Sequence, residues 1–285
     1  VLGFVGYDMP AGAFNFVPPG TDLFLLAALV AYSGAGGVNN IVLANWARDR
    51  GYGMGARAGY IPGAMGGTKV ALAHTGFTFD ASDAASERWR GWWRIISADQ
   101  WGVFGLGAIL GMLLPALLYV TFLPGGTQLQ GLGISAALAD AMTTRANPLL
   151  GGTIAFLGAW VLFKTQLDLM EGMVRAITDI LWTGSHRVRA WRGGDVRAVY
   201  YTVLGIMVVW GIVALRLAQP FVLLQIGANV AGFVLAIASL HLLYVNTRLL
   251  PRHVRPPMWR RIALVAMSVF YAVFVGASIR AVLAQ

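Results

Sequence analysis

Long apolar stretches separated by polar, mostly basic segments dominate the pattern of this chain. A helix needs roughly 20 apolar residues to cross a bilayer. Six stretches reach that length, over residues 21–45, 100–123, 148–176, 197–217, 220–246 and 260–282. The pattern predicts an all-α polytopic membrane protein whose six transmembrane helices form one membrane domain over residues 1–285.

The segment over residues 50–99 is too polar to cross a membrane and too long for a simple turn. Near its end Trp89, Trp92, Trp93 and Ile96 recur at positions i, i+3, i+4 and i+7, while arginines occupy other faces. This pattern is typical of an amphipathic helix at the membrane interface. We therefore predict a cytoplasmic loop over residues 50–99 that contains an interfacial helix.

Composition and charge agree with a membrane environment. The chain is 58% hydrophobic and 12% charged, whereas soluble domains carry about a quarter charged residues. Its net charge of +9 comes mainly from three segments that follow the first, third and fifth stretches. Cytoplasmic loops collect Lys and Arg, so these segments are predicted to face the cytoplasm and both termini to face outside. The basicity then needs no nucleic-acid partner, and we expect membrane lipid around a multi-pass protein of the plasma membrane.

The first apolar stretch is interrupted near its middle. At 1.5 Å per residue, the segment after Tyr32 lies roughly 15 Å along the helix, close to the bilayer midplane. Irregular backbone at that depth needs protein or a water-filled cavity around it, as in the broken helices of transporters. The residues predicted to contact a cation there are Ser33, Gly34, Gly36, Gly37, Asn39 and Asn40. In the alternative interpretation, the glycines only allow a neighbouring helix to approach closely.

The third stretch carries an unusual line of charges. Lys164, Asp168, Glu171, Arg175 and Asp179 are spaced by three or four residues and share one stripe of a helix. Charges within a span are costly, so this stripe is expected to face protein or water. We predict an ion pathway lined by Lys164, Gln166, Asp168 and Glu171. Alternatively, the helix is long and tilted, and its inner half emerges into the cytoplasm.

The fifth stretch adds two amides, Gln225 and Asn229, four residues apart on one helix face. They are predicted to complete the shell of the cation; a hydrogen bond between helices is the alternative. The chain has no cysteine, and its four histidines lack ligand spacing. We therefore expect no enzyme activity and no cofactor, and any metal ligands other than His or Met are oxygen atoms.

Three segments resemble bacterial Nramp-related divalent-metal transporters. They are residues 31–40 (AYSGAGGVNN), 45–55 (NWARDRGYGMG) and 87–93 (ERWRGWW). The resemblance covers the second half of such a protein, from its sixth helix onward. It implies a LeuT-type fold of two inverted five-helix repeats, so that this chain is the carboxy-terminal half and the missing amino-terminal half is its partner.

One departure from that family bears on the choice of ion. Its sixth helix supplies a thioether and a histidine from a Met-Pro-His sequence, whereas this chain has Gly36-Gly37-Val38 in the corresponding place. Carbonyl and amide oxygens alone suit a hard cation such as Mg²⁺ better than Fe²⁺ or Mn²⁺.

The sequence thus predicts an ion- or proton-coupled secondary transporter whose substrate is a divalent cation of the Mg, Mn or Fe class. Two alternatives stay open. One is a transporter of a small organic solute such as an amino acid, whose carboxylate would bind at a half-helix amino terminus. The other is a membrane scaffold without transport activity.

Overall fold

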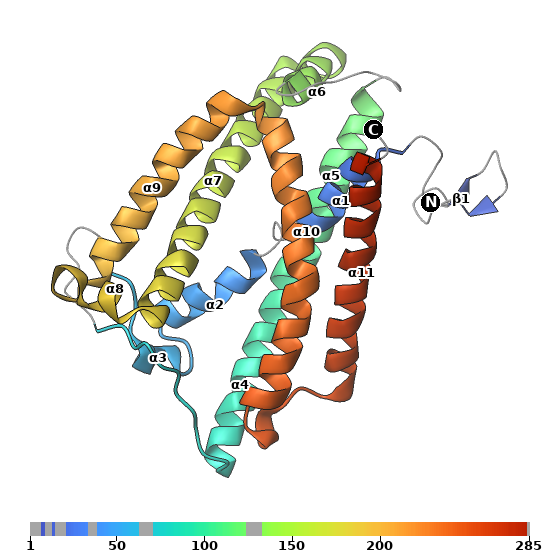
Figure 1. The fold of residues 1–285 in the computed structure, drawn as a ribbon. Coiled ribbons are helices and arrows are strands. Elements are labelled where there is room, and N and C mark those ends of the chain that lie inside the picture. The colour runs from blue at the N-terminus through green and yellow to red at the C-terminus, as the bar shows by residue number, and fades with distance from the viewer. Residues whose placement is uncertain are drawn as a thin grey trace. The chain divides into compact units, whose positions relative to one another are not determined.

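Helices make up most of the chain in the computed structural model, which describes residues 7–8, 13–14, 21–33, 39–62, 71–123 and 133–283 (Figure 1). In this part of the chain, five helices are long and apolar enough to cross a membrane. They run over Asp83–Phe122, Pro148–Gly184, Val196–Leu217, Pro220–Leu249 and Met258–Leu283. The prediction of a mainly helical chain is confirmed, and these helices are compatible with a polytopic membrane protein. The first predicted stretch is not among the five, because its helix is only ten residues long.

The chain divides into two compact units, each described by itself. The first comprises residues 1–33, 225–250 and 255–285. It contains the strands β1 (Tyr7–Asp8) and β2 (Ala13–Phe14), α1 (Leu23–Tyr32), most of α10 (Pro220–Tyr244), the π-helix η4 (Val245–Leu249) and α11 (Met258–Leu283). Helix α1 packs along α11, and its alanines at 27, 28 and 31 are buried. These small side chains allow the close approach that apolar helices need in a membrane.

The second unit comprises residues 34–224 and 251–254. Its α-helices are α2 (Asn39–Asp49), α3 (Gly55–Ala58), α4 (Asp83–Ala98), α5 (Leu106–Phe122), α6 (Gly133–Arg145), α7 (Pro148–Gly184), α8 (His186–Ala190) and α9 (Val196–Leu217). It also contains the π-helix η2 (Asp99–Gly105) and the 3-10 helices η3 (Trp191–Gly193) and η5 (Arg252–Val254). Helix α7 packs against α6, α9 and α2, and Figure 1 shows α9 running beside α7. Val174 of α7 and Val196 of α9 are almost completely buried in the core of this unit.

The predicted amphipathic helix is present as α4, but it does not stand apart from the following span. Ser82 caps its amino terminus by accepting from the Ala85 N–H, and α4 then continues through η2 into α5 as one helix of 40 residues. No proline lies between Asp83 and Leu114, so nothing in the sequence ends the helix there. A seven-residue π-helical segment joins the amphipathic part to the apolar part. Its interfacial, cytoplasmic placement stays a prediction.

Replacing Gly151 with alanine should lower the free energy of unfolding by about 1–3 kcal/mol, because overpacking forces helices apart. A methyl group at Gly151 would lie 2.6 Å from the Ala139 carbonyl oxygen and 1.9 Å from Oγ1 of Thr143, both on α6. Gly152 is the matched control, since nothing lies within 4 Å of the same position there. Unfolding in mixed micelles should show Gly152→Ala to be neutral or slightly stabilising. Equal effects at the two positions would contradict this packing.

Candidate functional site

Helix α1 ends inside the first apolar stretch. Asp22 caps its amino terminus by accepting from the N–H groups of Phe24 at 2.9 Å and Leu25 at 3.0 Å. At the other end Ser33 leaves the helical conformation with ψ 125°, and its hydroxyl donates to the Leu29 carbonyl at 2.8 Å. Ten residues span roughly 15 Å, about half of the hydrocarbon thickness. The helix therefore stops at the predicted interruption.

The rest of the predicted cation site is described only in part. Gly34, Gly36 and Gly37 lie outside the described residues. Helix α2 begins at Asn39, but the side chains of Asn39 and Asn40 also lie outside what the structure describes. Cation contacts by all six residues from Ser33 to Asn40 stay predictions.

The amide of Asn229 ties three helices of the first unit together. Its Nδ2 donates to the carbonyl oxygens of Phe24 in α1 at 3.1 Å and of Gln225 in α10 at 2.9 Å. Its Oδ1 accepts from the Ser278 hydroxyl of α11 at 2.7 Å. These are the helix-to-helix hydrogen bonds that formed the alternative interpretation. Coordination of a cation by Gln225 or Asn229 stays a prediction. Because Asn229 Oδ1 already accepts from Ser278, it would have to bind a cation through its second lone pair.

Replacing Asn229 with alanine should lower the free energy of unfolding by about 1–3 kcal/mol, because hydrogen bonds to both neighbouring helices are lost. A double-mutant cycle of Asn229→Ala and Ser278→Ala, followed by unfolding in mixed micelles, isolates the contact between these side chains. We expect a coupling energy of about 0.5–1.5 kcal/mol. Strict additivity would show that the 2.7 Å contact contributes nothing.

The charged stripe of α7 divides into an exposed and a half-buried part. Lys164 pairs with Asp168, and their side chains are 66% and 41% exposed. Gln166 is also exposed. Further along the helix, the side chain of Arg175 is only 16% exposed and pairs with Glu171 at 2.6 Å. Lys164, Gln166 and Asp168 are available to line a path, as is Glu171, whose side chain is 43% exposed, while Arg175 is committed to contacts within the protein.

The half-buried part forms an ion-pair network with the end of α2. Arg175 also pairs with Asp49, whose side chain is 12% exposed. Arg48 pairs with Asp179 at 2.7 Å and with Asp49 at 2.7 Å. Burial lowers the pKa of Arg48, but the hydrogen bonds and negative charges of Asp179 and Asp49 outweigh burial and raise it. The Arg48 guanidinium therefore stays charged. The alternating charges of Asp179, Arg48, Asp49 and Arg175 hold α2 against α7.

Sequence reasoning missed Arg48 and Asp49 as members of this network. They were visible as an adjacent opposite-charge pair at the end of the first apolar stretch, within the 45–55 segment. Their partners are 126 and 131 residues away in the chain. Only the packing of α2 on α7, where Val42 meets Gly172, brings these charges together.

No family model, curated protein or solved structure matches this chain. The resemblance to Nramp-related transporters therefore stays a prediction from the three sequence segments.

Across the described ranges, no group of three or more His, Cys, Asp or Glu side chains is arranged to hold a metal ion. The acidic groups near one another on α2 and α7, Asp49, Glu171 and Asp179, are paired with arginines. A cation site in the predicted place would be built from backbone carbonyls and amide oxygens, which are ligands for hard cations.

Proposed function

We propose that this chain is part of an ion- or proton-coupled secondary transporter that carries a divalent cation as its substrate. The observation that carries the proposal is the end of α1 at Tyr32, ten residues into an apolar stretch. Free carbonyls at a helix end within a membrane require partners, and a desolvated cation is one that they suit. The glycine-rich segment and the Asn39-Asn40 pair follow directly.

The charges of α7 support a path to that site. Lys164, Gln166 and Asp168 are exposed within little more than one turn of α7, and charges kept in an apolar helix are commonly functional. Under the proposal these groups line an aqueous route, and Asp168 and Glu171 balance charge or relay protons. The Arg48, Asp49, Arg175 and Asp179 network holds α2, the helix that follows the glycine-rich segment, firmly on α7.

Among the candidate cations, Mg²⁺ is the one that oxygen ligands bind best. In the described part of the chain, no cluster of cysteine or histidine side chains supplies the softer ligands that Fe²⁺ or Mn²⁺ would use. Transport of an organic solute on the same fold would instead use amide N–H groups of the broken helix. The two functions differ in which substrate crosses the membrane.

Uptake into proteoliposomes containing the full-length protein tests the proposal. We expect uptake of divalent cations, measured by a metal-sensitive dye and driven by a proton or sodium gradient, with radiolabelled amino acids at the level of empty vesicles. Amino-acid uptake without cation uptake would support the organic-solute alternative and contradict the proposal. Absence of both fluxes, with the protein inserted and folded, would leave the scaffold as the function.

A further inference from the structure

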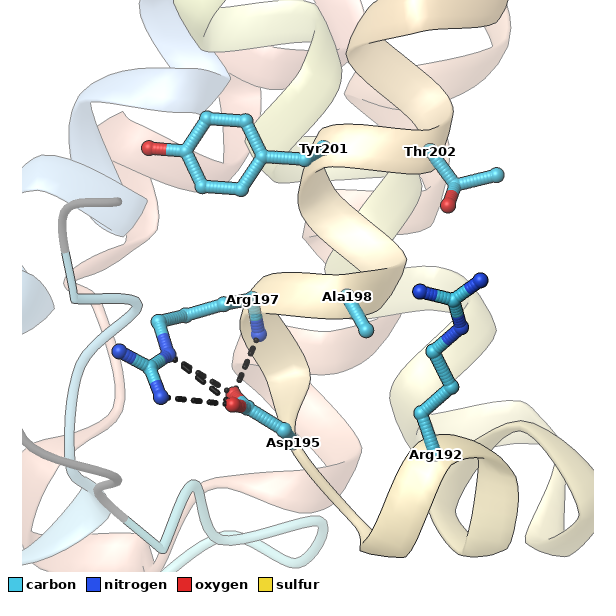
Figure 2. Close-up of a pocket in the computed structure, with 6 residues that line it drawn as sticks. All are labelled: Arg192, Asp195, Arg197, Ala198, Tyr201 and Thr202. Atoms are coloured by element: carbon cyan, nitrogen blue, oxygen red, sulfur yellow. Dashed lines mark hydrogen bonds and ion pairs between the residues drawn. The ribbon is translucent and has the colours of Figure 1, made fainter. Parts of the chain in front are cut away.

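An open hollow of about 490 Å³ lies beside the first turns of α9, in the second unit. Its lining combines two arginines, one acid, two hydroxyl side chains and one small residue: Arg192, Asp195, Arg197, Ala198, Tyr201 and Thr202. Figure 2 shows Arg192 and Thr202 on one side of Ala198, and Arg197 and Tyr201 on the other. Ala198, whose side chain is small, lies on α9 between these two pairs.

The charges in this hollow do not cancel. Asp195 accepts from the backbone N–H of Arg197 at 3.0 Å and pairs with the Arg197 guanidinium at 2.7 Å, so its carboxylate caps α9 and is neutralised. Arg192 has no carboxylate partner among the described residues, and its guanidinium lies 5.3 Å from the ring centroid of Trp191. The ring orients the cation without neutralising it. The hollow therefore has a net positive charge.

The backbone of Arg192 has an unfavourable conformation. Arg192 has φ 46° and ψ 44°, a left-handed conformation that is unfavourable for residues other than glycine. Gly193 and Gly194 follow at φ 72° each, and the chain then enters the cap of α9 at Asp195. This strained turn directs the Arg192 side chain up along α9 toward Thr202 (Figure 2). Strain held at a charged surface position is a recurrent feature of binding sites.

The sequence of α9 indicates where the hollow lies relative to a bilayer. The first two turns of α9 carry Arg197, the exposed Tyr201 and Thr202, and the residues that follow from Val203 to Val213 are apolar. Aromatic residues of this kind collect at the headgroup level of membrane proteins. From Val196 to Thr202 the helix rises roughly 9 Å, which is comparable to the thickness of a headgroup layer. In a bilayer this position would coincide with the lipid phosphates.

We propose that this hollow is a binding site for a phosphate group, with Arg192 and Thr202 as its principal contacts. The planar guanidinium of Arg192 donates two parallel hydrogen bonds to phosphate oxygens, and the Thr202 hydroxyl donates a third. The charge of Arg197 is balanced by Asp195, so the excess positive charge comes from Arg192. Basic pockets at the ends of transmembrane helices bind anionic headgroups in this way. The shared chemistry is a phosphate anion, supplied by a phospholipid headgroup or by free phosphate.

Binding to the full chain in nanodiscs and in detergent separates the two sources. Native mass spectrometry and titration would use three ligands: phosphatidylglycerol, zwitterionic phosphatidylcholine and inorganic phosphate. For a lipid site we expect phosphatidylglycerol to bind preferentially and Arg192→Gln to weaken it about tenfold, the value of one charge-assisted contact. For a free-phosphate site, inorganic phosphate should bind with the same dependence on Arg192.

Arg187→Gln is the matched control, because Arg187 is an exposed arginine of α8 outside the lining and its loss changes the net charge equally. It should leave the affinity unchanged. Arg192→Gly removes the charge and also relieves the left-handed strain, so weaker binding by a better-folded variant excludes misfolding as the cause. Thr202→Val should weaken binding by a smaller factor. If the Arg192 and Arg187 variants bind every ligand equally, the attraction is non-specific and the proposed site is overturned.

Discussion

Replacing Arg175 with leucine should lower the free energy of unfolding by about 2–4 kcal/mol, measured in mixed micelles. Removing one partner of a buried ion pair costs about 3–5 kcal/mol, because the remaining charge stays desolvated, and partial exposure reduces that figure. Arg175 faces Asp49 and Glu171, and its guanidinium lies 5.7 Å from the centroid of the Tyr200 ring on α9. Its loss leaves Arg48 to neutralise Asp49 and Asp179 by itself and removes the arginine that pairs with Glu171.

Lys164 is the matched control for Arg175. It forms an ion pair on the same helix at the same i,i+4 spacing, but its side chain is 66% exposed. Exposed pairs contribute about 0–1 kcal/mol, so Lys164→Leu should have a small effect. Arg175→Lys should be intermediate, since a single ammonium cannot donate to Asp49 and Glu171 as a guanidinium does. Equal losses at positions 164 and 175 would contradict a buried network between α2 and α7.

Replacing Trp182 with alanine should cost about 3–5 kcal/mol, the usual range for removal of a buried aromatic side chain. Trp182 is 6% exposed in the core that α7 and α9 form with Ile61 and Leu72. Its Nε1 also donates to the Leu72 carbonyl at 3.0 Å, so the indole fastens the segment after residue 71 to α7. Trp182→Phe keeps most of the packing and should lose only about 1 kcal/mol, for the hydrogen bond.

Trp160 provides the comparison on the same helix. It is 55% exposed, and Trp160→Ala should therefore change the free energy of unfolding by much less than Trp182→Ala. A larger loss at position 160 than at position 182 would show that the core of the second unit lies elsewhere.

The long apolar helices could be predicted from the sequence because length and hydropathy alone determine them. Boundaries were less predictable. The stretch predicted over 148–176 continues to Gly184, since no proline or strong cap interrupts it before Ser185. Similarly, the amphipathic helix joins the following span through a π segment, a local change of hydrogen bonding that has no composition signal.

The contacts between residues on different helices could not be predicted from the sequence. The spacing of charges on α7 predicted one stripe, yet which charges are buried depends on where α2 packs. The same holds for Asn229, whose partners in α1 and α11 are 205 and 49 residues away. Helix periodicity places a residue on a face but does not say which helix covers that face.

We propose that the segment after α1 binds a divalent cation, and isothermal titration calorimetry of Mg²⁺ into the purified full-length protein measures that binding. The informative variant is Asn39→Ala/Asn40→Ala, with Asn246→Ala in η4 as the matched control and circular dichroism as the check of folding. We predict saturable Mg²⁺ binding that the double variant weakens by at least about tenfold, the value of roughly 1.4 kcal/mol, and that the control leaves unchanged. No binding by the folded protein, or equal affinity in the double variant, would show that Asn39 and Asn40 do not hold a divalent cation.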